Sequence, residues 1–467
     1  MSHFKLLIDG KLVDGAGSID VINPATEEAF ATCPTADEGQ LNAAVAAAKA
    51  AYPKWKALSW AERQAYLVKL ADALEARQEE FARLLTQEQG KPLMFAHGEM
   101  AATLGTIRYL ASLELDNAVL ADDDTKKVIE QRIPLGVVAA ITPWNFPLVL
   151  LAIKLAPALV AGNTMVAKPA PTTPLTTLLL GEICAEILPP GVINIIADDN
   201  DLGGLLTKHP DIAKVAFTGS TATGKKVMES VASTLKRITL ELGGNDAAIL
   251  LDDVDPKKAA SDVFKGATFN SGQVCVAVKR LYVHESQYDA VCEELAKLAE
   301  ATVVDDGLKQ GSVMGPLQNK AQYDKVKGYI EDARTRGNVI AGGTMEDRKG
   351  YFIRPTIVRD IADDAPLVKE EQFGPVLPVL KYADIDDAIE RANDSEYGLA
   401  GSVWSSDPGR ALDVALRVES GTIWVNKCLD MDPTVPFGGS KQSGIGVEYA
   451  LDGLKEYTQR KIINMAK

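Results

Sequence analysis

The stretch that decides the fold spans residues 217–226 and reads FTGSTATGKK. An apolar segment leads into a glycine turn and then into a helix-start pattern, so a strand, a turn and a helix are predicted in that order. Exposed amides and the Ser220 hydroxyl at a helix N-terminus suit a phosphate. The stretch nearly matches Gly-x4-Gly-Lys-Ser/Thr, but Lys226 stands where a hydroxyl would coordinate magnesium. A nucleoside triphosphatase site therefore fails, whereas a phosphate site for a dinucleotide remains.

Short apolar runs alternate with helical patterns on both sides of this stretch. Strands are predicted at 136–141, 164–168, 192–196, 214–217, 237–241 and 247–251, and helices at 147–161, 174–187 and 222–232. This alternation predicts an α/β fold with a parallel sheet covered on both faces. Such sheets bind ligands at the carboxyl ends of their strands.

The rest of the chain shows three different sequence patterns. Residues 38–115 read as long helices, with the clearest periodic patterns at 38–51 and 61–85. The stretch 119–133 is polar and extended, which predicts either a hairpin reaching a neighbouring subunit or a solvated loop. A second alternation runs from about 255 to 440, with strands predicted at 279–284, 375–380, 400–405 and 422–426.

Composition excludes several classes of partner. The 64 acidic residues outnumber the 49 basic ones, giving a net charge of −15 that argues against nucleic acid. No apolar run reaches the ~18 residues of a membrane span, and the longest, 146–162, contains Lys154 and is predicted to be a buried helix. The start lacks a secretory signal, and His3, His97, His209 and His284 have no zinc-ligand spacing. Five dispersed cysteines predict reduced thiols and a cytoplasmic protein: Cys33, Cys184, Cys275, Cys292 and Cys428.

One cysteine differs from the others. In the stretch 269–275, FNSGQVC, small and polar residues precede Cys275 and would let a substrate approach its sulfur. Cys184 and Cys292 fall at apolar helical positions that suit a core residue, and Cys428 is also predicted to be an inert core residue. A free thiol of pKa ~8.5 needs local help to ionise at neutral pH. A helix N-terminus following Cys275 could supply it.

Two further motifs follow predicted strands. In LELGGN, 240–245, Glu241 ends an apolar strand, and the glycine pair lets the chain turn sharply and expose the carboxylate in a crevice. In TPWNFP, 142–147, two prolines fix the loop and Asn145 presents an amide donor, as an oxyanion hole requires. A salt-bridged surface glutamate and a rigid turn with buried aromatic side chains are the alternatives.

Together these elements resemble the aldehyde dehydrogenase superfamily along nearly the whole chain. The family's asparagine, glutamate and cysteine motifs correspond to PWNF at 143–146, ELGG at 241–244 and GQVC at 272–275. Four further motifs match: VAKP at 166–169, EEQFGP at 370–375, PFGG at 436–439 and SGIGVE at 443–448. One such motif would be weak, but seven in the right order are a specific signature.

The resemblance implies the domain organisation and the partners. It implies a Rossmann-type cofactor domain, an α/β catalytic domain and a small oligomerisation hairpin. The corresponding segments are 1–115 and 135–243 for dinucleotide binding, 244–455 for catalysis, and 116–134 with 456–467 for oligomerisation. A homodimer or homotetramer is implied, with a small aldehyde as substrate and NAD, NADP or both as cofactor.

The implied mechanism also stands on the chemistry of the residues. Cys275 would attack the aldehyde carbon, and the thiohemiacetal oxyanion would be held by Asn145 and a backbone amide at Cys275, a donor of a kind worth about 3–4 kcal/mol. Loss of hydride leaves a thioester, which a water activated by Glu241 would hydrolyse. Glu448 would relay protons or fix a loop.

The resemblance assigns further residues to the cofactor and to the aldehyde. Lys168 would bind the adenosine ribose, Ser220 with its turn the pyrophosphate, and Glu371 with Phe373 the nicotinamide riboside. The predicted cofactor contacts are Thr142, Trp144, Lys168, Pro171, Gly219, Ser220, Glu371 and Phe373. The predicted aldehyde tunnel comprises Phe146, Leu150, Ile153, Phe269, Met431 and Phe437.

Two positions depart from the family pattern. NAD-preferring relatives commonly carry a glutamate three residues after the lysine, where it would accept from the ribose 2′-hydroxyl and repel a 2′-phosphate. Pro171 stands there in this chain, so use of both cofactors is compatible with the sequence. The stretch 270–272, NSG, varies the usual spacing, so the loop backbone is expected to differ while Phe269 still lines the pocket.

The uncharged tunnel favours a medium-chain aliphatic or aromatic aldehyde, because an unpaired buried carboxylate would be strongly unfavourable. A closed core between the domains is the alternative role for the same side chains. A semialdehyde dehydrogenase and a coenzyme-A-acylating enzyme are the alternative activities, and the latter type usually lacks the Glu241 base. A non-catalytic relative, as some lens proteins of this fold are, would not need Cys275, Glu241 and Asn145 together.

Overall fold

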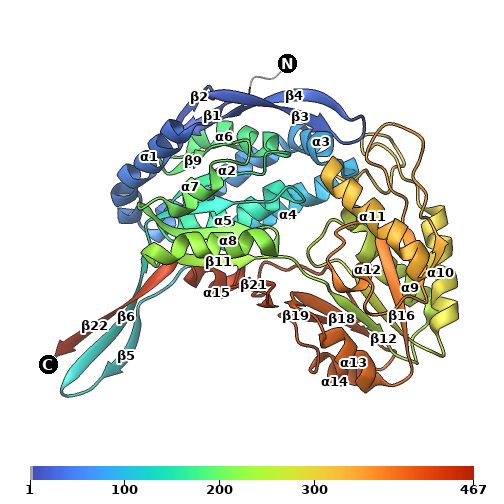
Figure 1. Cartoon of the computed structure of the whole chain (residues 1–467). Coiled ribbons are helices and arrows are strands. Elements are labelled where there is room, and N and C mark those ends of the chain that lie inside the picture. Colours follow the sequence, from blue (N-terminus) through green and yellow to red (C-terminus); the bar gives the residue numbers. More distant parts are fainter. Residues whose placement is uncertain (1–3) are drawn as a thin grey trace.

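The computed structural model describes residues 4–467. His3 and the start of the chain, where no secretory signal is predicted, lie outside the described residues. An eight-stranded sheet and a seven-stranded sheet form two bodies, and a narrow arm extends from the first (Figure 1). In the described chain, no helix is long and apolar enough to cross a membrane.

The eight-stranded sheet has the order β2-β1-β9-β8-β7-β10-β11-β21. Its five central strands are parallel: β7 (Val137–Ile141), β8 (Thr164–Lys168), β9 (Ile193–Ile195), β10 (Ile212–Thr218) and β11 (Arg237–Glu241). The chain moves outward from β7 to β9 and then restarts at β10 beside β7. The switch point between β7 and β10 is the position where sheets of this type bind ligands.

Helices cover both faces of this sheet because its strands are apolar throughout. The crossover helices are α5 (Pro147–Val160), α6 (Leu175–Ile187), α7 (Gly203–Lys208) and α8 (Thr221–Val231). The edges are antiparallel: β1 (Leu6–Ile8) pairs with β2 (Lys11–Val13), and β21 (Gly444–Ile445) pairs with β11. The strand β21 comes from the segment predicted to belong to the catalytic domain, so the chain returns to the first sheet near its end.

Four helices precede the sheet: α1 (Glu38–Ala57), α2 (Trp60–Ala76), α3 (Gln78–Gln89) and α4 (Leu93–Ala111). The first two begin at capping boxes formed by Asp37 and Ser59. The periodic stretch 61–85 forms two helices, because α2 ends at Ala76 and α3 begins at Gln78; Arg77 lies between them and its guanidinium pairs with Glu80 and Glu182. A hairpin of β3 (Gly17–Asn23) and β4 (Glu28–Thr35), absent from the sequence-based prediction, lies before α1.

The seven-stranded sheet has the order β14-β15-β16-β13-β12-β18-β19, and hydrophobic clusters pack on both of its faces. Its strands are β12 (Ala247–Leu250), β13 (Arg280–His284), β14 (Asn338–Ala341), β15 (Thr356–Arg359), β16 (Val376–Tyr382), β18 (Ala400–Trp404) and β19 (Thr422–Val425). The helices are α9 (Pro256–Thr268), α10 (Tyr288–Ala301), α11 (Lys320–Arg336), α12 (Pro366–Lys369), α13 (Ile385–Asn393) and α14 (Pro408–Ala415). The prediction omitted β14 and β15 and found the other strands.

The arm is a three-stranded antiparallel sheet of β5 (Ala118–Asp122), β6 (Lys126–Pro134) and β22 (Thr458–Ala466). It extends away from both sheets together with the C-terminus (Figure 1). Of the two alternatives for 119–133, the structure therefore has the hairpin. The short helix α15 (Ala450–Lys455) follows β21 of the first sheet, packs against α5 and leads into β22.

Candidate active site

A pocket of about 460 Å³ opens at the carboxyl ends of the first sheet's strands, facing the second body. Its lining comes from the segments that follow β7, β8, β10 and β11 and from the Cys275 and Glu371 loops. Predicted site residues that line it are Thr142, Trp144, Asn145, Leu150, Pro171, Gly219, Ser220, Cys275, Glu371 and Phe373. The fold thus brings together motifs that are more than 200 residues apart in the sequence.

The loop before Cys275 has an unusual backbone. Asn270, Ser271 and Gly272 all have positive φ, at 51°, 59° and 73°. The two non-glycine residues are held by their side chains: Asn270 Nδ2 donates to the Asn145 carbonyl at 3.2 Å, and Ser271 Oγ donates to the Gly315 carbonyl at 2.8 Å. Left-handed backbone is costly for such residues, so these bonds fix the approach to the thiol.

The helix N-terminus expected after Cys275 is wrong, because residues 275–277 form a turn that leads to β13. The nearby cation is instead Lys279, which donates to the carbonyls of Val274 at 2.9 Å and Cys275 at 2.5 Å. Burial raises the pKa of Cys275 to about 12, and Lys279 opposes that shift while Glu371 adds to it. The half-buried thiol is therefore protonated at neutral pH before a substrate arrives.

Asn145 presents its side chain to the same pocket. Its Nδ2 donates to the carbonyl of Gln273 at 3.0 Å, two residues before Cys275. Its Oδ1 has no partner among residues 4–467. The backbone carbonyl of Asn145 accepts from two donors, Asn270 and a buried lysine, Lys91, at 2.9 Å. One amide hydrogen of Nδ2 remains for a ligand, because the other is used by Gln273.

Glu241 ends β11, where both carboxylate oxygens are buried without a hydrogen-bond partner in the described chain. Burial raises the pKa of Glu241 well above its usual range, and the negative charge of Glu448 raises it further. Lys154 lowers it and donates to Glu448 Oε1 at 2.5 Å, with both side chains buried. Glu448 also exchanges two backbone hydrogen bonds with Phe437, at 2.7 and 2.9 Å.

The residues at the cofactor end of the pocket fit a dinucleotide. Ser220 caps α8 by accepting from the Thr223 amide at 3.3 Å, and the first turn of this helix faces the pocket. Glu371 Oε1 accepts from the Gly244 amide at 3.1 Å. A Cβ on Gly243 would lie 2.4 Å from Glu371 Oε2, so a larger residue there would displace this carboxylate from its present position. The rings of Trp144 and Phe373 meet edge to face at 5.4 Å.

Lys168, predicted to bind the adenosine ribose, has a buried partner that the sequence did not indicate. Its Nζ lies 2.5 Å from Asp198 Oδ1, and Asp198 Oδ2 accepts from the Leu202 amide at 2.9 Å. Neighbouring Asp199 and Asn200 are exposed, and Asn200 lines the pocket beside Pro171. The positive charge of Lys168 is thus already compensated within the protein.

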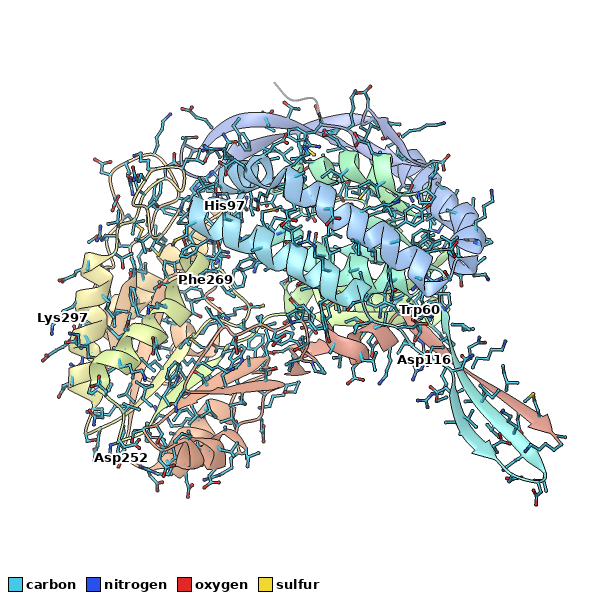
Figure 2. All side chains as sticks on the ribbon, turned by 180° about the vertical axis from the view of Figure 1, so that it is seen from behind. Trp60, His97, Asp116, Asp252, Phe269 and Lys297 are labelled. Carbon is cyan, nitrogen blue, oxygen red and sulfur yellow. The ribbon has the colours of Figure 1, made fainter. Side chains whose placement is uncertain are left out.

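Five of the six predicted tunnel residues share one apolar cluster with Cys275: Phe146, Leu150, Ile153, Phe269 and Phe437. The rings of Phe146 and Phe269 stack at 6.0 Å, and Phe95 on α4 packs edge-on against Phe269 at 4.9 Å. Figure 2 shows Phe269 between the two bodies. Met431 is 38% exposed and is not among the cluster's residues. Sequence reasoning did not assign Val274, Trp424 and Tyr449 to the tunnel, and they also belong to this cluster.

Buried lysines are the other residues that sequence reasoning missed. Lys91 and Lys279 touch the backbone of the site, and Lys154 lies beside the Glu241–Glu448 pair. A lysine inside a long apolar segment, as at 146–162, is a signal that could have found the last of them. Among residues 4–467, no group of three His, Cys, Asp or Glu side chains is arranged to hold a metal ion.

The comparisons with known proteins agree on one family. The model of the aldehyde dehydrogenase family matches residues 12–463. The mitochondrial aldehyde dehydrogenase of Leishmania tarentolae is 42% identical, over 99% of this chain and 95% of that protein. Phenylacetaldehyde dehydrogenase of Pseudomonas fluorescens is 40% identical, over 99% and 96%. The chain belongs to the aldehyde dehydrogenase family.

Solved structures add the cofactor. The NAD⁺ complex of a Bacillus cereus aldehyde dehydrogenase has a TM-score of 0.97 and 38% identity, covering 100% of this chain and 97% of that one. An NADP-dependent enzyme of E. coli has a TM-score of 0.97 and 36% identity, covering 100% and 98%. The protein is therefore an NAD(P)-dependent aldehyde dehydrogenase with the fold of that family.

Proposed function

We propose that this enzyme oxidises apolar aldehydes to carboxylic acids through a thioester on Cys275 that Glu241 hydrolyses. The observation that carries the proposal is the position of Cys275, which belongs to both the dinucleotide pocket and the apolar cluster. A thiol at this junction can meet an aldehyde from one side and a nicotinamide from the other. Absorbance of the reduced nicotinamide, followed with hexanal and without coenzyme A, tests the activity.

In the acylation half, Cys275 Sγ bonds to the aldehyde carbon and its proton leaves to solvent or to Glu241. The carbonyl oxygen becomes an oxyanion, which the free N–H of Asn145 Nδ2 stabilises. Removing such a donor typically slows a reaction by about 10²–10³-fold. Bound NAD(P) supplies the hydride acceptor. The carbon loses hydride, and Cys275 is left as a thioester.

In the deacylation half, Glu241 removes a proton from water, which attacks the thioester carbon. The acid leaves and the Cys275 thiolate takes up a proton. Two unpartnered carboxylate oxygens and a pKa raised by burial suit a general base that takes a proton from water. Burial contributes most to that raised pKa, the charge of Glu448 raises it further, and Lys154 lowers it. Glu448 would relay protons or fix a loop beside the base. A coenzyme-A-acylating enzyme would need no such base.

The dinucleotide would lie along the pocket, with the first turn of α8 at its pyrophosphate and Glu371 at a ribose. The Trp144–Phe373 ring pair would wall the nicotinamide end. At the adenosine end, Pro171 offers no carboxylate to repel a 2′-phosphate, but Asp198 already compensates Lys168. We infer that both cofactors bind and that NAD is preferred.

The aldehyde would occupy the apolar cluster beside Cys275. Each buried methylene contributes about 0.8 kcal/mol, whereas a carboxylate there would lack a cation among the cluster's residues. We expect kcat/KM for hexanal or benzaldehyde to exceed that for succinate semialdehyde by about tenfold or more, or 1.4 kcal/mol. A preference for the semialdehyde would favour the alternative activity and contradict the apolar tunnel.

The arm supports a homo-oligomer. Apolar side chains on its strands are exposed, including Val119, Leu120, Ile462 and Met465. A projecting three-stranded sheet with such a surface suits a second copy of the chain. We expect a homodimer or homotetramer, which light scattering after size exclusion would measure.

We propose a cytoplasmic location because the cysteines are free thiols. All five cysteines are free, and three of them, Cys33, Cys184 and Cys292, are buried. Reduced cysteines are typical of proteins in a reducing compartment.

A further inference from the structure

We propose that Lys91 and Glu99 are positioning residues for the oxyanion donor, holding the Asn145 loop and the start of α5 as one rigid unit. The inference rests on the proposed role of Asn145 in acylation. Both charged side chains are completely buried. Neither belongs to the motifs that carry the chemistry, and neither lines the pocket.

Lys91 stands between two helices. Gly90 ends α3 with a left-handed backbone at φ 95°, and Pro92 precedes α4, so the chain turns sharply at Lys91. A Cβ on Gly90 would lie 2.9 Å from atoms of Pro24 and Pro316, which makes glycine necessary there. The position of the lysine backbone is thereby fixed from both sides.

The Lys91 ammonium group makes three contacts, all directed at the site. It lies 2.5 Å from Glu99 Oε2 and donates to the Asn145 carbonyl at 2.9 Å. It also lies 3.8 Å from the centre of the Phe146 ring, within the range of a cation–π interaction. The Lys91 cation thus contacts both the backbone of Asn145, the proposed oxyanion donor, and the ring of Phe146 in the proposed aldehyde tunnel.

Glu99 connects the Lys91 ammonium group to the N-terminus of α5. Its Oε1 accepts from the amides of Leu148 at 3.0 Å and Val149 at 3.4 Å, in the first turn of the helix. A carboxylate at a helix N-terminus is favoured by the helix dipole. Because α5 carries Leu150 and Lys154, the same carboxylate fixes both a tunnel residue and the partner of Glu448.

The arrangement matters because the Asn145 side chain has little support of its own. Its Nδ2 has one protein acceptor, and its Oδ1 has no partner in the part of the chain described here. Its direction therefore depends on the backbone to which it is attached. Oxyanion donors must lie within hydrogen-bond distance of an atom that moves during the reaction, so small displacements are costly.

A purely structural role would join α4 to α5 without affecting the oxyanion, and a double-mutant cycle separates the two roles. The rate constant of the first NADH turnover with hexanal is measured by stopped flow for wild type, Lys91→Met, Asn145→Ala and the double variant. We expect Lys91→Met to slow acylation about 30-fold in the wild-type background, less than the roughly 10²–10³-fold of a lost oxyanion donor, because the donor is displaced and not removed. In the Asn145→Ala background its further effect should be about threefold or less.

Glu99→Gln keeps the shape of the side chain and serves if Lys91→Met does not fold. We expect it to slow acylation about tenfold, with the same loss of effect when Asn145 is alanine. Glu88→Gln is the matched control, since Glu88 is also buried and also caps a helix, accepting from the Leu175 and Thr176 amides of α6 at 2.7 and 3.0 Å. It should lower the melting temperature but leave acylation unchanged.

Three results would overturn the proposal. Lys91→Met or Glu99→Gln could lower only the melting temperature, or either could slow acylation equally in both backgrounds, or Glu88→Gln could slow it as much as Glu99→Gln. Failure of the proposed mechanism is recognised separately. In that case Asn145→Ala alone would leave acylation at the wild-type rate.

Discussion

Two buried glutamates of this enzyme, Glu99 and Glu241, differ in the hydrogen-bond and ion-pair partners of their carboxylate oxygens. Glu99 has a lysine on one oxygen and two helix amides on the other. Glu241 has no hydrogen-bond partner on either oxygen within residues 4–467. A fully paired carboxylate holds structure in place, whereas an unpartnered one is available to bind or move a proton. The comparison separates residues that build the site from residues that act in it.

Three buried lysines belong, like Glu99, to the residues that build the site. Lys91, Lys154 and Lys168 each form a buried pair with a carboxylate behind the pocket, at 2.5 Å in every case. Breaking a buried pair by removing one partner is strongly unfavourable, because an uncompensated charge remains. Each pair lies beside one working part: the oxyanion loop, the general base or the ribose end of the pocket.

The largest expected effect concerns the pocket thiol. Cys275→Ala should abolish aldehyde oxidation and leave NAD⁺ binding within about twofold, because the thiol forms the covalent bond. Cys184→Ala is the control, since Cys184 is a buried thiol on α6 that belongs neither to the dinucleotide pocket nor to the apolar cluster around Cys275. Steady-state rates and calorimetric cofactor binding measure both. Aldehyde oxidation by the Cys275→Ala variant would contradict the proposal that Cys275 forms the covalent bond.

A smaller effect is expected on the pH dependence of deacylation. Glu241 acts as a base only when deprotonated, so the rate should rise with pH through its raised pKa. Glu448→Gln removes the negative charge that raises this pKa, while Lys154, which lowers it, remains. The pKa of Glu241 should fall, and the rise in rate should begin at lower pH. A kcat–pH profile measured where deacylation limits turnover decides this, and an unchanged or opposite shift would show that Glu448 does not set the base.

The smallest effect is expected at the ribose end. Asp198→Asn should free Lys168 for a 2′-phosphate and raise the NADP-to-NAD ratio of kcat/KM about three- to tenfold, the scale of one partly screened charge. Pro171→Glu should lower the same ratio by repulsion. Asp199→Asn, at an exposed neighbour, is the control. Calorimetric binding of each cofactor provides a second readout, and equal ratios in all variants would mean that these side chains do not face the 2′ position.

The sequence was sufficient for the parts of the molecule that local pattern determines. Strands such as 136–141 and 164–168, the turn at Gly219 and the order of the motifs predict the first sheet and the pocket at its carboxyl edge. Arg77 and Pro53 show the limit, since one helix ends and the next begins at the arginine, which pairs with distant Glu182, whereas α1 continues through the proline.

The supporting pairs could not be predicted in the same way. Lys154 and Glu448 are 294 residues apart, and nothing in the local pattern of either residue indicates the other. Lys91 and Glu99 are only eight apart, but their contacts with Asn145 and Leu148 depend on how α4 packs against α5. The cation beside Cys275 could not be predicted either, because Lys279 meets the Val274 and Cys275 carbonyls only when the chain turns before β13.

The most direct test compares Glu241→Gln with Glu99→Gln in the first and later turnovers of NADH formation with hexanal. The account predicts a near-stoichiometric burst for Glu241→Gln, followed by a steady state slower by about 10²-fold or more, because acylation proceeds and the general base is missing. It predicts a slowed first turnover with no accumulated thioester for Glu99→Gln. Wild-type steady-state turnover by Glu241→Gln, or a burst lost in that variant and intact in Glu99→Gln, would contradict the account.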